Sequence, residues 1–254
     1  MLLHGLTATR RYVVMGSRAL QRSGHLVIAY DARGHGESGP APDRQYGYGE
    51  LVGDLGAVLD ASAVERAVLA GASMGAHTAA RFALEHPERV GGLVLITPAY
   101  DPVGFGSAAE LARWDALAHG LREGGVEGFV AAYPLADLPD RLRPTIEQVL
   151  RQRLSAHRHP RAVADALEAV LRSRPFTGLD QLGRIAVPTL VVASRDEPDP
   201  GHPLAVGEAW ARAIPGARLV VEDPPRAGGD RFHSPIAWQG GQLSKLIAET
   251  ALRM

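Results

Sequence analysis

The stretch "LAGASMGAHTAA", residues 69–80, decides the fold, because it reads as a buried strand, a tight turn and the start of a helix. Ser73 has Gly71 two residues before it and Gly75 two residues after it. A sharp strand-to-helix turn crowds the backbone, so glycine is needed on both sides of the residue at its apex. The spacing predicts that Ser73 stands exposed above a sheet as a nucleophile. The alternative is an ordinary glycine-rich helix start.

Strand and helix patterns alternate on either side of this turn. Continuous apolar runs suit strands that are buried on both faces of a parallel sheet. Such runs occupy residues 25–31, 67–73, 92–97, 188–194 and 218–223, and helix candidates lie near 10–22, 50–60, 75–86, 204–214 and 235–252. The alternation predicts a mostly parallel, doubly wound α/β fold.

Residues 101–183 break this rhythm with three helical stripes and no convincing strand. Apolar residues spaced three and four apart share one face of a helix. The stripes are Leu111, Trp114, Ala118 and Leu121; Ile146, Val149, Leu150 and Leu154; and Val163, Ala166, Leu167, Val170 and Leu171. We therefore predict a core domain of residues 1–100 and 184–254, with residues 101–183 inserted as a helical cap.

Composition narrows the classes of function. The chain has 254 residues, a formal net charge of -1 and no cysteine. Such a charge gives no field that would steer nucleic acid or an anionic membrane toward the protein. Without cysteine there are no disulfides, thiolate metal sites or cysteine catalysis. No apolar run approaches the ~20 residues that span a bilayer. We expect a cytoplasmic protein that acts on a small molecule and binds neither nucleic acid nor membrane.

The segment "GHGESG", residues 34–39, matches a dinucleotide-binding pattern and follows a predicted strand. Such a site needs a helix to open there, so that the helix N-terminus meets the pyrophosphate. The chain continues instead as "PAPDRQYGYG", which predicts a loop. We therefore predict no nucleotide site, and no metal or organic cofactor is implied elsewhere.

A serine nucleophile needs a base and a group that orients the base. Asp196 follows the predicted strand 188–194, and His233 follows the last predicted strand. With Ser73 they lie in the order Ser, Asp, His, at the carboxyl ends of parallel strands, where active sites of open α/β sheets form. His233 would take the serine proton, and Asp196 would hold the imidazole and stabilise its cation.

Other residues could fill these two roles. Asp199, Glu197 or Asp101 could be the acid, and His202 could be the base. The remaining histidines look structural. "HRH", residues 157–159, could bind a metal, but a solvated helix end explains it better because no third ligand lies nearby.

The oxyanion formed by attack on a carbonyl needs hydrogen-bond donors already in place. One should be the backbone N–H of Met74, directly after the nucleophile. The loop "LLHGLT", residues 2–7, offers His4 and Gly5 followed by Leu6, and the glycine allows a tight turn there. The Leu6 N–H is the predicted second donor.

These motifs together resemble the α/β-hydrolase family. The similarity rests on "LLHG", "YDARGHGES", "GASMG", "SRDEPDP" and "FHSP", in this order along nearly the whole chain. It implies an α/β-hydrolase fold with Ser73, Asp196 and His233 as the catalytic triad, and with residues 101–183 as the cap that roofs the active site. Relatives with an aspartate nucleophile are disfavoured, because position 73 is serine.

The start of the chain departs from this family. The family has about two strands and most of a third before its His-Gly motif, whereas only residues 1–3 precede His4 here. The N-terminal strands therefore look truncated. We expect that the true start lies upstream; the alternatives are reliance on a partner and an inactive relative.

The resemblance implies a serine hydrolase that cleaves a carboxylic ester, thioester or lactone through an acyl-enzyme. The alternatives are an acyltransferase, a carbon–carbon lyase or a cofactor-free perhydrolase on the same scaffold, and a truncated non-catalytic protein. Six arginines crowd a stretch of the cap that has few acids: Arg141, Arg143, Arg151, Arg153, Arg158 and Arg161. They could attract an anionic substrate, although a solvated helix face in an arginine-rich protein explains them more simply. The oligomeric state cannot be read from the sequence.

Overall fold

Within the part of the chain that the structure describes, the sheet has five parallel strands in the order β1-β2-β3-β4-β5. The computed structural model describes residues 1–195, 199, 201–222 and 238–252. The strands are β1 (Leu2–Leu3), β2 (Ala67–Ala72), β3 (Val90–Ile96), β4 (Thr189–Ala193) and β5 (Arg218–Val221). Four of the five predicted strands are therefore present as β2 to β5.

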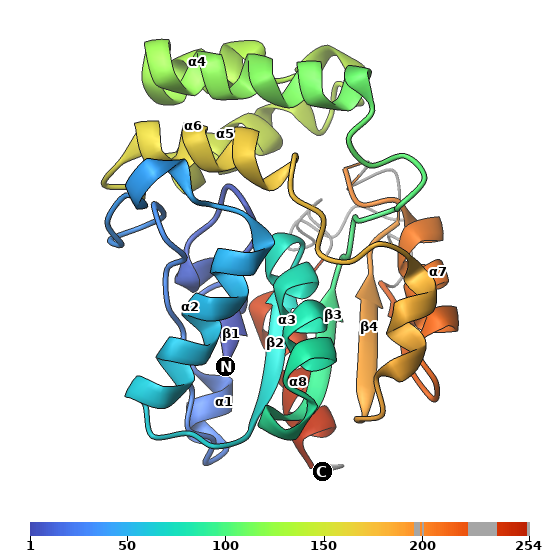
Figure 1. Ribbon diagram of the computed structural model, residues 1–254. Coiled ribbons are helices and arrows are strands. Elements are labelled where there is room, and N and C mark those ends of the chain that lie inside the picture. The colour runs from blue at the N-terminus through green and yellow to red at the C-terminus, as the bar shows by residue number, and fades with distance from the viewer. Residues whose placement is uncertain (196–198, 200, 223–237, 253–254) are drawn as a thin grey trace.

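Helices cover both faces of this sheet, as a doubly wound fold requires (Figure 1). One face packs on α2 (Tyr48–Ala61), α3 (Met74–Glu85) and α7 (Leu204–Ala213), and the other packs on α1 (Ala19–Arg22) and α8 (Gly240–Ala251). Neighbouring residues of one strand supply the two cores, because successive side chains point to opposite faces. Leu69 faces the first core and Ala70 the second. Burial on both faces explains the continuous apolar runs of the sequence.

Two predictions for the N-terminal part were wrong. The run at 25–31 makes only an isolated parallel bridge, from Ala29 to Leu2. Its neighbour β1 offers a ladder of just two residues, so a longer strand has nothing to pair with. The helix predicted at 10–22 is reduced to a 3-10 turn, Arg10–Tyr12, and α1. Positive φ values at Met15 and Gly16 interrupt it.

The predicted helical insertion is present as α4 (Ala108–Ala132), α5 (Arg143–Leu154) and α6 (Pro160–Val170). These helices form a layer beyond the carboxyl ends of the strands (Figure 1). Their core includes Ala118 and Leu121 of α4, Leu150 of α5 and Leu167 of α6. Each of these residues comes from a predicted stripe, so the helical reading is confirmed. The division into two domains stays a prediction.

Residues 34–39 form turns and no helix opens there. Gly34 and Gly36 have φ values of 75° and 50°, in the left-handed region that glycine adopts at no steric cost. The turn therefore lacks the helix N-terminus that a dinucleotide pyrophosphate would need.

Candidate active site

Ser73 is the single residue between the end of β2 and the start of α3. Its backbone has φ 51° and ψ -115°, a strained conformation for a residue with a side chain. The Ser73 amide donates to the Ile96 carbonyl on β3 at 2.9 Å, and the Ser73 carbonyl accepts from the Ala76 amide at 2.8 Å. These bonds over-determine the turn, so the strained conformation persists and fixes the direction of the serine side chain.

The two glycines around Ser73 are required by close backbone contacts. A Cβ on Gly71 would lie 2.2 Å from the Gly75 carbonyl oxygen, and a Cβ on Gly75 would lie 2.3 Å from the Leu3 carbonyl oxygen. Both distances are far below van der Waals contact. The spacing read from the sequence therefore has a steric cause, and β1, β2 and α3 meet at this turn.

The loop after β1 packs directly against the serine. A Cβ built on Gly5 would lie 3.4 Å from Cβ of Ser73. Leu6, Ser73 and Met74 line one cavity. Among the described residues, neither the Leu6 amide nor the Met74 amide has a hydrogen-bond acceptor. Met74 begins α3, and amides in a first helical turn have no acceptor within their own helix. The two predicted oxyanion donors are thus brought together beside Ser73 with their N–H groups available.

Three buried histidines hold the carbonyl groups of this loop. His4 Nδ1 donates to the carbonyl of residue 5 at 2.8 Å, and His35 Nε2 lies 2.6 Å from the carbonyl oxygen of residue 6. His157 Nε2 contacts the carbonyl of residue 7 at 3.2 Å. Consecutive carbonyls fixed from behind leave the backbone of residues 5–7 little freedom, so the Leu6 amide is held in place.

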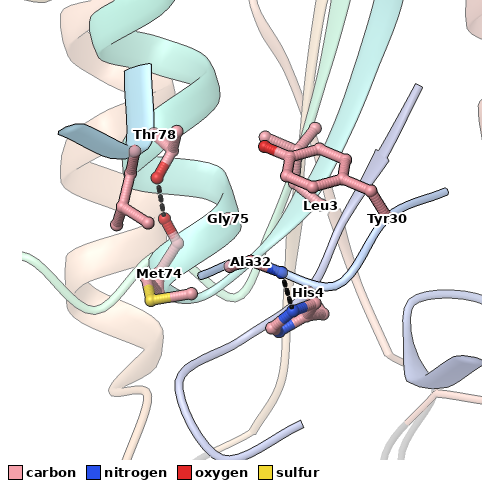
Figure 2. A pocket seen from close by; sticks show the side chains of 8 residues that line it. Leu3, His4, Tyr30, Ala32, Met74, Gly75 and Thr78 are labelled. Carbon is pink, nitrogen blue, oxygen red and sulfur yellow. Dashed lines mark hydrogen bonds between the residues drawn. The ribbon is translucent and has the colours of Figure 1, made fainter. Parts of the chain in front are cut away.

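Two of these histidines use their other ring nitrogen as an acceptor. His4 Nε2 accepts from the Ala32 amide at 2.9 Å, in the pocket behind the loop, where Gly75 of α3 also lies (Figure 2). His157 Nδ1 accepts from the Gly36 amide at 2.8 Å. One donor and one acceptor nitrogen describe a neutral imidazole. Burial lowers the pKa of His4 to about 3 and that of His157 to about 4, which agrees with this state.

The prediction that residues 157–159 form a solvated helix end was wrong for His157. Its side chain is buried, and it joins the segment between α5 and α6 to the loop after β1. The contact connects residues that are 150 positions apart in the chain, which periodicity cannot reveal. Among the described residues, no group of three or more histidine or acidic side chains is arranged to hold a metal ion.

Ser73 lines two adjoining cavities, both partly open to solvent. They share polar residues from the turn after β2, the helical insertion and the segment after β4: Ser73, Tyr133, Arg153, Asp199 and His202. The rest of the lining is largely apolar, with Leu138, Ile146 and Leu150 from the helical insertion. A largely apolar cavity with a few polar groups suits a small or medium organic molecule.

The predicted acid and base, Asp196 and His233, lie outside the described residues, as does the alternative acid Glu197. The alternatives Asp199 and His202 are brought to the cavity, where His202 Nδ1 lies 2.7 Å from Asp199 Oδ1. Asp101 is exposed, accepts from the Val103 amide at 3.1 Å and lines a different pocket. Among the described candidates, only Asp199 and His202 line the serine cavities.

Sequence reasoning missed Glu222, which directly follows β5. Its buried carboxylate accepts from the Arg195 amide at 2.6 Å. Burial raises the pKa of Glu222, and the charge of Asp199 acts in the same direction. Glu222 therefore anchors the start of the segment that carries the candidate acids. In the sequence, the only indication of this role was that Glu222 is an acidic residue at the end of the last predicted strand.

His77 lies on α3, one turn beyond Ser73, and the prediction that it is structural is confirmed. Its Nε2 accepts from the amides of Ala99 and Tyr100 at 3.0 and 3.1 Å. Its Nδ1 lies 2.8 Å from the Tyr48 hydroxyl. Burial lowers the pKa of His77 to about 3, so the ring is a neutral tie between α3, α2 and the segment after β3.

The sequence profile of the alpha/beta hydrolase fold family matches residues 1–226. The chain belongs to this family. A relative from Variovorax paradoxus is 32% identical over 183 residues, which span 70% of this chain and 66% of that protein. The 2-hydroxy-6-oxononadienedioate/2-hydroxy-6-oxononatrienedioate hydrolase 2 of Pseudomonas putida is 32% identical over 212 residues, 80% of this chain and 70% of its own.

Solved structures agree with this assignment. The enol-lactonase of Burkholderia xenovorans has a TM-score of 0.71 and 25% identity, covering 99% of this chain and 88% of its own. A thermophilic esterase of Thermogutta terrifontis has a TM-score of 0.72 and 27% identity, and the match covers 99% of this chain and 86% of the esterase chain. These relatives are hydrolases of the alpha/beta fold, and their names differ in substrate. Within the described residues, no helix combines the length and apolarity needed to cross a membrane.

Proposed function

We propose that this protein is a serine hydrolase that cleaves a carboxylic ester, thioester or lactone of a small or medium molecule through an acyl-enzyme. The observation that carries the proposal is Ser73, held at φ 51° between β2 and α3, where it lines a cavity together with Leu6 and Met74. A strained serine at this turn is the nucleophile arrangement of the fold.

In the proposed reaction, Ser73 Oγ attacks the substrate carbonyl carbon while His233 takes its proton. The negative charge that develops on the carbonyl oxygen is stabilised by the N–H groups of Leu6 and Met74. When the tetrahedral intermediate collapses, the bond to the leaving group breaks and the leaving group takes the proton from His233. Water, deprotonated by the same imidazole, then attacks the acyl-serine. The bond to Ser73 Oγ breaks, the serine oxygen takes the proton back from His233, and the acid is released. Asp196 orients the imidazole and stabilises its cation.

Asp199 and His202 are the alternative acid and base. Their 2.7 Å contact and their place in the serine cavity support this pairing. The order of the family motifs supports Asp196 and His233. Neither version includes a metal or organic cofactor, since the histidine carries out every proton transfer and the aspartate stabilises its cation.

The relatives' names support ester and lactone substrates, because an esterase and an enol-lactonase share the fold over 99% of this chain. Turnover of p-nitrophenyl esters and of small lactones tests the proposal, with Ser73→Ala as the matched variant. We expect kcat/KM to fall by at least about 1000-fold in Ser73→Ala, as when a triad nucleophile is removed. Equal activity in a folded Ser73→Ala protein would reject Ser73 as the nucleophile.

A further inference from the structure

Arg153 stands apart from the other arginines of α5. Arg151 pairs with Glu127 at 2.9 Å and with Glu147 at 2.8 Å on the outside of the helix. Arg143 pairs with Asp140 at 2.8 Å. Arg153 lies in the last turn of α5 and lines both serine cavities. The other two arginines of α5 thus have carboxylate partners, whereas Arg153 has none among the described residues.

Among the residues that the structure describes, the guanidinium of Arg153 has no hydrogen-bond acceptor. Its Nε is buried and has no hydrogen-bond partner, and among the described residues Arg153 makes no ion pair. Its Cζ lies 5.6 Å from the centre of the Tyr12 ring, a cation–π contact that supplies no hydrogen-bond acceptor. Burying a cation in this way is unfavourable unless a partner compensates. A ligand with acceptor oxygens would provide that compensation.

The charges around Arg153 favour a ligand with a single negative charge. Asp199 lines the same cavities and attracts Arg153, but its Oδ1 already contacts His202. Asp199 would repel a dianion such as a phosphate monoester more strongly than it repels a monoanion. A carboxylate carries one charge, and its two oxygens match the guanidinium fork.

We infer that Arg153 binds a carboxylate group of the substrate, so that the preferred substrate is an ester, thioester or lactone that carries a free carboxylate away from the bond that is cleaved. This inference rests on the proposed function for the identity of the cleaved bond. The binding of the carboxylate itself does not depend on catalysis, because Arg153 and Ser73 are separate residues of one cavity.

Binding is therefore measured on the Ser73→Ala protein, which cannot turn a substrate over. The probes are the mono-anilides of succinic, glutaric and adipic acid and their methyl esters, which differ only in the carboxylate charge. The variants are Arg153→Met, which keeps the apolar stem of the side chain and removes the guanidinium, and Arg151→Met on the same helix as the matched control. Isothermal titration gives the Kd of each pair, and circular dichroism checks each fold.

We expect at least one anionic anilide to bind more tightly than its methyl ester. Arg153→Met should raise the Kd of that anilide by about 10- to 100-fold, the range of a charged hydrogen-bonded contact. Arg153→Met should change the Kd of the methyl esters by less than about threefold. Arg151→Met should leave the Kd of both the acids and the methyl esters unchanged, because an exposed ion pair contributes little. Equal binding of acid and methyl ester for every chain length, or no effect of Arg153→Met in a folded protein, would overturn the inference.

Hydrolysis by the Arg153→Met enzyme with Ser73 intact separates this result from the proposed function. Continued cleavage of neutral p-nitrophenyl esters, with unchanged anilide binding, would remove the inference and leave the hydrolase proposal standing. If carboxylate binding depends on Arg153 but the protein cleaves no ester, the inference about Arg153 would stand and the hydrolase proposal would be rejected.

Discussion

Gly75 lies against the carbonyl of Leu3, so closely that a Cβ at position 75 would come within 2.3 Å of the Leu3 oxygen. The first turn of α3 is thereby seated on the end of β1, next to the loop that carries the Leu6 amide. This contact joins the nucleophile turn to the proposed oxyanion site, and a change at Gly75 must disturb both.

Gly75→Ala is expected to lower the free energy of unfolding by more than about 2 kcal/mol and to abolish esterase activity, because backbone atoms cannot move away as a flexible side chain could. Gly53→Ala is the control. Gly53 is an exposed helical glycine of α2 with nothing within 4 Å of an added Cβ. Alanine there should raise the free energy of unfolding by about 0.5–1 kcal/mol. Urea unfolding measures both. Equal stability of the two variants would show that α3 is not seated on β1 in this way.

His157 is expected to position the oxyanion loop from the cap side. His157→Ala removes the partner of the Thr7 carbonyl and of the Gly36 amide. The Leu6 amide should then be less well placed, so kcat should fall about 10-fold while KM stays within about twofold, since the loss falls on the transition state. His157→Gln can make both hydrogen bonds and should restore most of kcat.

A purely structural role would give a different pattern for His157. His157→Ala would then lower the thermal midpoint without changing kcat at temperatures where the protein is folded. Steady-state kinetics with a p-nitrophenyl ester at 20 °C, alongside thermal melts of both variants, separates the two outcomes.

Stability should fall as the solution becomes acidic. Burial lowers the pKa of His4 and His77 to about 3 and that of His157 to about 4. The unfolded chain therefore takes up these protons first, below the ordinary histidine pKa of about 6.5. The stabilising contribution is complete above that pH and is lost as pH falls toward the folded pKa values. Each histidine should contribute a slope of up to about 1.4 kcal/mol per pH unit in that window.

Unfolding in urea at pH 7.5, 6.0 and 5.0 measures this slope. His157→Gln should reduce the slope of unfolding free energy against pH by the contribution of one histidine, because glutamine does not titrate. A free energy of unfolding that is flat between pH 7.5 and 5.0, or a slope that His157→Gln leaves unchanged, would contradict the neutral, buried state of these rings.

The choice of catalytic base can be decided by two matched substitutions. We expect His233→Gln to lower kcat by at least about 1000-fold, since the serine loses its proton acceptor. His202→Gln should stay within about 10-fold of the unchanged enzyme, as for a pocket residue that does not transfer the proton. Ester hydrolysis across pH 6–9 measures both. The opposite ranking would assign the chemistry to His202 and Asp199.

The strand, turn and helix around Ser73 could be predicted because all their constraints are local. Gly71 and Gly75 are fixed by contacts that any chain making this turn must have. The apolar runs of β2 to β5 were equally readable, since each is buried on both faces. The run at 25–31 has the same composition, but a strand also needs a partner, and its partner ends after Leu3.

The polar parts of the site depend on contacts that are distant in the sequence. His157 belongs to a stretch rich in arginine, and only its approach to Thr7, 150 residues away, shows that it is buried. Arg153 and Arg151, two residues earlier, lie in the same arginine-rich stretch, so the sequence alone does not distinguish them. Their difference is the direction in which each leaves α5: one meets Glu127 and the other meets the serine cavity.

The central claim is that Ser73 is an activated nucleophile, and labelling by a fluorophosphonate tests it most directly. The purified protein is treated with the probe, and the modified residue is located by mass spectrometry, with Ser73→Ala as the control. We predict one adduct on Ser73 and none in the variant. A folded protein that takes up no probe, or takes it up equally in Ser73→Ala, would contradict the claim.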